Sequence, residues 1–180
     1  MRVVGVMGSG TSAHEDLARP LGAYLARLGV HLLCGGGGGV MASVAKHFRA
    51  AGTQGLVVGI VPAARHASSS QRPLPPSGYP NPHVDLVIQT HLPARGADGT
   101  DLSSRNHINI LSSHVVVALP GGGGTLSEIA LARRYRTPIA VYRGSHPPLA
   151  GPAEPLLQAT ELYEIERFVE HHLDGPPTIP

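Results

Sequence analysis

Short apolar runs alternate with segments of helical apolar spacing along the whole chain. The apolar runs have the length of buried parallel strands, and we expect strands at residues 3–7, 31–34, 56–60, 84–89, 115–119 and 138–142. The other segments place apolar side chains on one face of a helix, and we expect helices at residues 12–28, 41–50 and 101–112, from Thr125 onward, and at 153–159 and 162–173. This alternation predicts an α/β fold, a Rossmann-like doubly wound parallel sheet in a single domain over residues 1–180.

Several positions modify this pattern. Pro20 lies inside the first helical segment, so that helix either kinks there or begins near Arg19. Asp101 is a candidate N-cap for the third helix. Residues 63–82 are rich in Pro, Ser, Gly and Arg, which predicts an irregular excursion rather than a linker between domains. We expect residues 175–180 to form a frayed tail.

Two glycine-rich loops follow predicted strands. One is Gly35–Gly39, and the other reads Pro-Gly-Gly-Gly-Gly-Thr-Leu-Ser-Glu at residues 120–128. Right-handed crossovers place both at the carboxyl edge of the sheet, where a helix N-terminus favours an anion, by default a phosphate. Either loop by itself is also explained by a tight turn with close helix–strand packing. Neither has the lysine of a Walker loop or the spacing of an NAD-binding loop.

The sequence therefore predicts a phosphate- or nucleotide-binding site at this edge. The expected binding residues come from three strand-to-helix loops and the third helix: Gly8, Ser9, Gly36, Gly37, Gly38, Gly39, Asn106, Gly121, Gly122, Gly123, Gly124 and Thr125. Ser9 and Thr11 either donate hydroxyl groups to a phosphate or cap the first helix. Arg105, early in the third helix, either reaches the ligand or is solvated.

Glu128 has two interpretations. With Thr125 it fits a capping box, in which Thr125 is the N-cap and Glu128 bonds back to the N-cap N–H. Alternatively, Glu128 is a carboxylate one turn into a phosphate-binding helix, placed for acid–base or charge-stabilising chemistry. The two roles are compatible if Thr125 caps the helix and Glu128 faces the pocket.

Composition narrows the classes of function. The chain has 180 residues and a net charge of +2, with 14% charged and 4% aromatic residues, which argues against a nucleic-acid surface. Cys34 is the single cysteine, so we expect a core residue in a reducing, cytoplasmic setting. No apolar run reaches the roughly 18 residues that span a membrane. The eleven histidines show no ligand spacing, with His14, His47 and His107 isolated, so we expect no metal site.

Residues 120–128 complete the signature Pro-Gly-Gly-x-Gly-Thr-x-x-Glu, and the chain thereby resembles the LOG (Lonely Guy) family, long labelled "possible lysine decarboxylases". The resemblance extends over residues 3–142 and includes Gly35–Met41, residues 58–62 and Arg105. It implies a Rossmann-like fold and a homodimer or higher homo-oligomer with the pocket close to the subunit interface. It also implies hydrolysis of the N-glycosidic bond of nucleoside 5'-monophosphates to free base and ribose 5-phosphate.

By this resemblance Arg105 and Glu128 are the catalytic pair, and Gly121–Thr125 hold the 5'-phosphate. Glycosidic cleavage passes through an oxocarbenium-like transition state that a carboxylate stabilises. An arginine can bind phosphate or ribose oxygens, or keep the carboxylate ionised. Lys46, the only lysine, lies in the second predicted helix, so we reject lysine decarboxylation with pyridoxal phosphate and expect no required cofactor.

Two positions depart from the phosphoribohydrolases. Asn106 stands where they carry lysine, Ser127 stands where they carry a second acidic residue, and the loop at Gly35–Gly39 is shorter. This pattern is similar to the side branch that includes the molybdenum cofactor carrier proteins. Two functions follow: a nucleoside 5'-monophosphate phosphoribohydrolase or, as the alternative, a non-catalytic carrier or sensor of a phosphorylated ligand such as molybdenum cofactor or a nucleotide. The expected partner in both is a small phosphorylated ligand, with no nucleic acid and no membrane.

Overall fold

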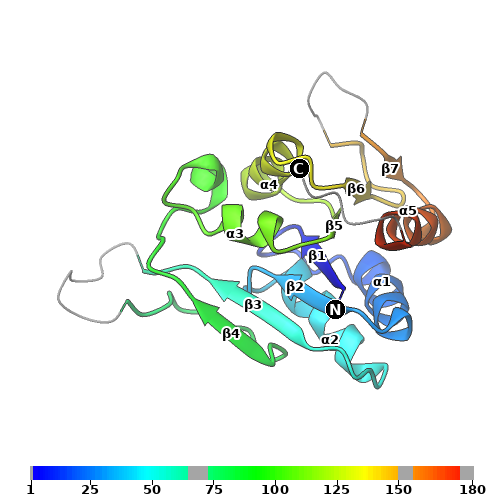
Figure 1. Cartoon of the computed structure of the whole chain (residues 1–180), viewed down its shortest axis with the longest axis horizontal. Coiled ribbons are helices and arrows are strands. Elements are labelled where there is room, and N and C mark those ends of the chain that lie inside the picture. Colours follow the sequence, from blue (N-terminus) through cyan, green and yellow to red (C-terminus); the bar gives the residue numbers. More distant parts are fainter. Residues whose placement is uncertain (1, 65–72, 150–155, 175–180) are drawn as a thin grey trace.

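The computed structural model describes residues 2–64, 73–149 and 156–174. Its strands form one parallel sheet (Figure 1). They are β1 Val3–Met7, β2 His31–Cys34, β3 Val57–Val61, β4 Leu86–Gln89, β5 Val115–Ala118, β6 Ile139–Tyr142 and β7 Gln158–Ala159. Their order across the sheet is β4-β3-β2-β1-β5-β6-β7. The direction of winding reverses between β1 and β5, and sheets of this kind bind ligands outside the carboxyl ends of the strands at that point.

Helices cover both faces of the sheet (Figure 1). They are α1 Glu15–Leu28, α2 Val40–Ala50, α3 Asn106–Leu111, α4 Gly123–Arg134, α5 Leu162–Asp174 and the short 3-10 helix η1 Gly96–Thr100. Apolar side chains of α1, α2 and α5 pack in one core, and those of α3 and α4 pack in the other. The sheet is therefore the middle layer of three, as in doubly wound folds.

β5 shows how the sheet is held between these cores. Val115 and Val117 point toward α1, α2 and α5, whereas Val116 and Ala118 point toward α3 and α4. All four side chains are fully buried, which explains why this strand is a continuous apolar run instead of an alternating one. Burial of each valine stabilises the fold by roughly 1.5–3 kcal/mol. The end of β5, and the glycine loop that follows it, is fixed by this packing.

The Rossmann-like α/β fold is confirmed. The six expected strands are present, with ends that differ by at most two residues. α1 begins at Glu15 and continues through Pro20, so the alternative of a start near Arg19 is wrong. No helix of the described residues is long and apolar enough to cross a membrane.

Two expected helices are wrong in part. Residues 158–159 form strand β7 at the sheet edge instead of ending a helix over 153–159, and residues 153–155 lie outside the described residues. α3 begins at Asn106 instead of residue 101. Asp101 does not cap it, because its carboxylate accepts the Ser103 N–H at 2.8 Å and the Ser103 hydroxyl at 2.6 Å in a local turn.

The predicted excursion over residues 63–82 is irregular in its described part, residues 63–64 and 73–82, which contains no helix or strand. The remainder of the excursion and the predicted tail at residues 175–180 lie outside the described residues. The short helix η1 at Gly96–Thr100 is not among the helices expected from the sequence.

Candidate functional site

Three strand-to-helix loops meet at the carboxyl ends of β1, β2 and β5. The N–H of Ser9, after β1, donates to the carbonyl of Pro120, after β5, at 3.2 Å. The carbonyl of Ser9 accepts the N–H of Val40, at the start of α2, at 2.9 Å. The peptide groups of one residue thus link all three loops. The two glycine-rich loops lie together at the point where the winding reverses.

The β1–α1 loop is ordered by its own hydroxyl groups. Oγ of Ser9 accepts the N–H groups of Thr11 at 3.2 Å and of Ser12 at 2.9 Å, a turn that serine commonly forms. A Cβ on Gly8 would lie 2.9 Å from the methyl groups of Val40, so Gly8 lets α2 approach the end of β1. Gly8 has a packing role, and Ser9 holds the loops together.

The first half of the β2–α2 loop is covered by the chain that follows β3. Gly36 and Gly37 are buried. A Cβ on Gly37 would lie 2.9 Å from the Tyr79 ring, and Nδ2 of Asn81 donates to the Gly37 carbonyl at 2.9 Å. The structure therefore places Gly36 and Gly37 under residues 79–81, away from open space.

The second half of this loop faces the β1–α1 loop. Gly38 and Gly39 are partly exposed. Gly39 has φ of 59°, and a Cβ there would lie 2.3 Å from the carbonyl oxygen of Ser9. This conformation and this approach both require glycine. Of the four predicted glycines in this loop, Gly38 and Gly39 are the pair that lies at the loop junction.

The N-terminus of α4 is open on one side. α4 begins at Gly123 with Gly122 at the N-cap position. A Cβ on Gly122 would meet no atom within 4 Å. On the opposite side, Cβ atoms on Gly123 and Gly124 would lie 3.4 and 3.5 Å from Cα atoms of η1, so the helix end is packed there. The first N–H groups of α4, which have no intrahelical acceptors, are available beside Gly122.

Thr125 lies inside α4, two residues after the helix begins. The predicted capping box of Thr125 and Glu128 is therefore wrong, because Gly122 occupies the cap. The hydroxyl of Thr125 is buried, has no hydrogen-bond partner among the described residues, and would be 2.1 Å from a Cβ on Gly121. A buried hydroxyl without a partner costs about 1–3 kcal/mol, so this group is a candidate donor to a ligand.

Glu128 is buried, with 7% of its surface exposed. Burial raises the pKa of its carboxyl group to about 7, while the charge of Arg105 and the side chain of Asn109 act in the opposite direction. The group is thus close to half ionised at neutral pH, the condition under which a carboxyl group both gives and takes a proton readily.

Arg105 is buried rather than solvated, with 4% of its surface exposed. It occupies the N-cap position of α3 instead of lying within the helix. Its Nη1 donates to Oδ1 of Asn106 at 2.7 Å, and a Cβ on Gly35 would lie 2.4 Å from its Nη2. Its Nε is buried without a partner among the described residues. Asn106 therefore orients the guanidinium group against the end of β2.

Asn109 is a site residue that the sequence analysis missed. It lies one turn after Arg105 in α3, and none of its surface is exposed. It is near enough to Glu128 to lower the pKa of that group, yet neither amide atom has a hydrogen bond of regular geometry among the described residues. The four-residue spacing from Arg105 was the available signal, because residues i and i+4 share a helix face.

Two other predicted features have structural roles. Burial raises the pKa of the Cys34 thiol to about 11, so the thiolate is absent at neutral pH and Cys34 is a core residue.

Oγ of Ser127 donates to the Gly123 carbonyl at 2.8 Å and lies 3.1 Å from the Gly96 carbonyl. Ser127, which stands in place of a second acidic residue, therefore joins α4 to η1.

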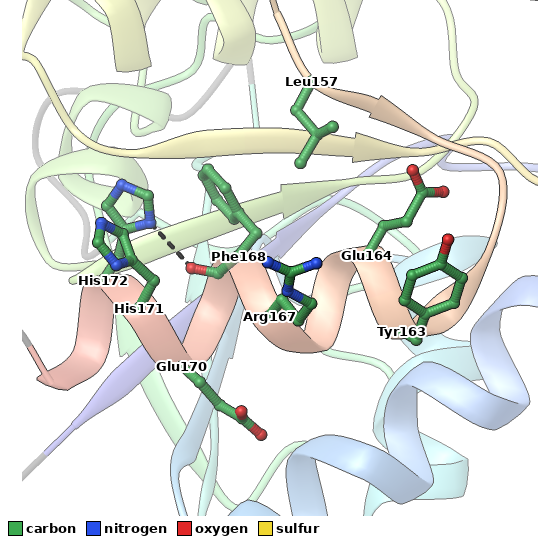
Figure 2. Close-up of a pocket in the computed structure, with 8 residues that line it drawn as sticks. All are labelled: Leu157, Tyr163, Glu164, Arg167, Phe168, Glu170, His171 and His172. Carbon is green, nitrogen blue, oxygen red and sulfur yellow. Dashed lines mark hydrogen bonds between the residues drawn. The ribbon is translucent and has the colours of Figure 1, made fainter.

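An open groove lies elsewhere on the molecule. Figure 2 shows that its walls are side chains of α5 together with Leu157, next to β7. It contains none of the predicted site residues. The groove is exposed at the edge of the sheet beyond β6, and we assign it no part in the candidate site.

His14 and His47 are not isolated, contrary to the expectation, and Nε2 of His47 contacts Oε2 of Glu15 at 2.6 Å. His14, at the N-cap position of α1, packs edge-on against His146, with ring centroids 4.8 Å apart. His107, in contrast, has a structural role, because its ring contacts the Tyr135 hydroxyl at 2.7 Å and the Asp101 carbonyl at 3.0 Å.

Comparison with known proteins identifies the family. Residues 1–168 match the SLOG cluster4 family. The chain belongs to this family. The LOG-like resemblance of the glycine motif is thereby confirmed.

Three relatives cover most of this SLOG cluster4 chain. An uncharacterised protein of Archaeoglobus fulgidus is 33% identical over 139 residues, which are 76% of this chain and 77% of that protein. The molybdenum cofactor carrier protein of Chlamydomonas reinhardtii is 29% identical with a TM-score of 0.73, over 97% of this chain and 99% of that one. The molybdenum cofactor binding protein of Rippkaea orientalis is 29% identical with a TM-score of 0.62, over 96% and 85% of the two chains.

Proposed function

We propose that this protein binds a phosphorylated small molecule at the junction of the three loops and carries it without chemical change. The observation that supports this most strongly is a set of buried polar groups without protein partners around one site. They are the Thr125 hydroxyl and Nε of Arg105. Buried polar groups are nearly always hydrogen-bonded in native proteins, so a ligand with several acceptor atoms accounts for both.

The phosphate lies at the end of α4 in this proposal. The N–H groups at Gly123, Gly124 and Thr125 and the hydroxyl of Thr125 donate to its oxygens, and the helix dipole favours its charge. Gly122 leaves the approach open. Arg105 supplies the buried positive charge that balances an anion away from water.

A molybdenum cofactor, a phosphorylated pterin, is the cargo that the relatives suggest. The carrier protein of Chlamydomonas reinhardtii is similar over nearly the full length of both chains. Asn106 and Ser127 favour this function over hydrolysis, because their side chains orient Arg105 and join α4 to η1 instead of adding charges to the site.

The second candidate is hydrolysis of a nucleoside 5'-monophosphate, and Glu128 is the observation that favours it. A carboxyl group with a pKa of about 7 can protonate a leaving base or take a proton from attacking water. In that reaction the bond between C1' of ribose and the base nitrogen breaks, water supplies the new oxygen at C1', and the base leaves with a proton.

One experiment separates the two functions. The purified protein is incubated with AMP, with N6-modified AMP and with molybdopterin, and both ligand binding and release of free base are measured. A carrier binds one ligand per site and returns it unchanged, whereas a hydrolase releases base, and Glu128→Gln slows that release by about 10²–10⁴-fold. Base release abolished by Glu128→Gln would overturn the carrier proposal, and absence of binding by every ligand would overturn both.

A further inference from the structure

A second cluster of chemically reactive side chains lies beside the glycine motif. The ligand atoms of His14, Asp16 and His146 lie within 4.8 Å of one another. Nε2 of His146 is 3.5 Å from Oδ2 of Asp16. Neither the carrier nor the hydrolase function requires these residues, and they belong to segments more than a hundred residues apart in the sequence.

The backbone presents His14 in an unusual way. It occupies the N-cap position of α1 with φ of 44° and ψ of 55°, in the left-handed region. A residue with a Cβ pays roughly 1 kcal/mol or more for this conformation, and such strain is concentrated at functional sites. Its side chain does not cap the helix, so helix capping does not explain histidine at this position.

His146 is fixed by a neighbouring arginine. Nη1 of Arg143 donates to the carbonyl of Gly144 at 3.1 Å and to the carbonyl of His146 at 2.8 Å. These bonds hold the turn after β6 in place. Asp16 is fixed independently, because it lies in the first turn of α1. The three side chains therefore come from two ordered segments, the start of α1 and the turn after β6, which lie close together.

The ring of His14 also lies near the carbonyl oxygen of Pro120. Donation from one ring nitrogen to that carbonyl, when a metal ion binds, would leave the other nitrogen as the lone-pair donor. Metal-binding histidines almost always have this arrangement, because the outer hydrogen bond fixes the tautomer and the ring orientation.

We propose that His14, Asp16 and His146 bind one divalent transition-metal ion, with Zn²⁺ the best match to the donor set. Two imidazoles and one carboxylate suit Zn²⁺ and its neighbours Co²⁺ and Ni²⁺, whereas Mg²⁺ prefers oxygen donors. Donor atoms around tetrahedral Zn²⁺ are about 3.3 Å apart, and the three donor atoms here lie within 4.8 Å of one another. Three protein ligands leave a coordination position open for water or an exogenous group.

The proposed metal ion would lie close to the glycine loop that begins at Pro120. Pro120, whose carbonyl lies near His14, is the residue that opens the motif. A metal ion held by His14 would therefore add positive charge beside the loop that carries the phosphate-binding helix end. The metal site stands independently of the proposed carrier function, because its evidence is the geometry of three other residues.

Direct binding measurements test the metal site. The full-length protein is stripped with EDTA, and Zn²⁺ binding is measured by competition with a chromophoric chelator. Binding of Co²⁺ is followed through its visible absorption, which reports nitrogen and oxygen ligands. We expect one ion per chain and no binding of Mg²⁺ at the same concentration. His14→Ala, Asp16→Asn and His146→Ala should each weaken Zn²⁺ binding at least tenfold.

His83→Ala is the matched control, because it removes a histidine from the segment before β4 and should leave Zn²⁺ affinity unchanged. Asp16→Asn keeps the size of the side chain at an exposed position, so its circular dichroism spectrum should match the parent and its loss of affinity cannot come from misfolding. The proposal is overturned if the parent binds Zn²⁺ no better than His14→Ala, or if His83→Ala weakens binding as strongly as the cluster variants. An ion that prefers the surface pair of His171 and His172 would give the first of these results.

Discussion

Glu128 is a carboxyl group that the fold removes from water at the centre of the candidate site. Its folded-state pKa of about 7 is above the ordinary value of 4.5. The folded protein therefore holds the proton more tightly than the unfolded chain does. Stability contributed by the protonated form is complete below pH 4.5, is lost as the pH rises toward 7, and is absent above that value.

Glu128→Gln should remove this pH dependence. Glutamine has nearly the same shape and never ionises, so we expect the variant to gain up to about 3 kcal/mol over the parent at pH 8 and little at pH 5. Urea denaturation at the two pH values measures the difference. An equal effect at both values would show that Glu128 is not held protonated by the fold.

Gly122 offers a change that separates ligand binding from folding. Aspartate is a favoured N-cap residue, and space is open at this position. Gly122→Asp should leave the melting temperature unchanged or raise it, yet weaken binding of a phosphorylated ligand at least about tenfold by repulsion. Isothermal titration with AMP or molybdopterin measures the loss. Gly122→Ala, which is neutral, should bind normally, and equal weakening by both variants would contradict a phosphate at this end of α4.

The elements around the site explain why sequence reasoning placed some residues correctly and others not. The order of strands, glycine loops and helices followed from apolar periodicity, and the loops meet as that order requires. The sequence analysis placed the N-cap of α4 at Thr125, because Thr125 and Glu128 fit the capping-box pattern. In the structure the N-cap is Gly122, and the helix includes Gly123 and Gly124. The burial of Arg105 was not predictable from spacing, because it depends on how the start of α3 lies against Gly35, at the end of β2.

Asn81 shows how an irregular segment supports a glycine loop. Its Nδ2 donates to the Gly37 carbonyl at 2.9 Å, and its Oδ1 accepts the His83 N–H at 3.0 Å. Asn81→Ala should destabilise the protein by about 2–3 kcal/mol, because two polar groups lose their partners in a buried place. Urea denaturation measures this cost. Ser103→Ala removes an exposed hydrogen bond and should cost less than about 1 kcal/mol, so similar losses would contradict the anchoring role.

At the scale of the whole molecule, the sheet and its two cores were predictable and the convergence of distant residues was not. Apolar periodicity specifies which side chains are buried, and a glycine motif specifies a loop. Neither specifies that His14 meets His146, or that residues 79–81 cover Gly37, because those contacts depend on how loops of irregular conformation lie in space.

A phosphorylated ligand should stabilise the entire chain, because it binds the folded state alone. At a free concentration one hundred times the dissociation constant, the expected gain is about 2.7 kcal/mol. Differential scanning fluorimetry with and without AMP or molybdopterin measures it. The gain should vanish in Gly122→Asp, and a gain of the same size in that variant would place the ligand elsewhere.

The peptide groups of Ser9 join the three loops through hydrogen bonds to Pro120 and Val40. Because these bonds involve only backbone atoms, they tolerate change in the side chains but not in the lengths or paths of the loops. Members of one family with this junction can therefore keep the arrangement of the two glycine-rich loops as a fixed unit. Divergence toward new ligands would then fall on the side chains around the junction and not on the paths of these loops.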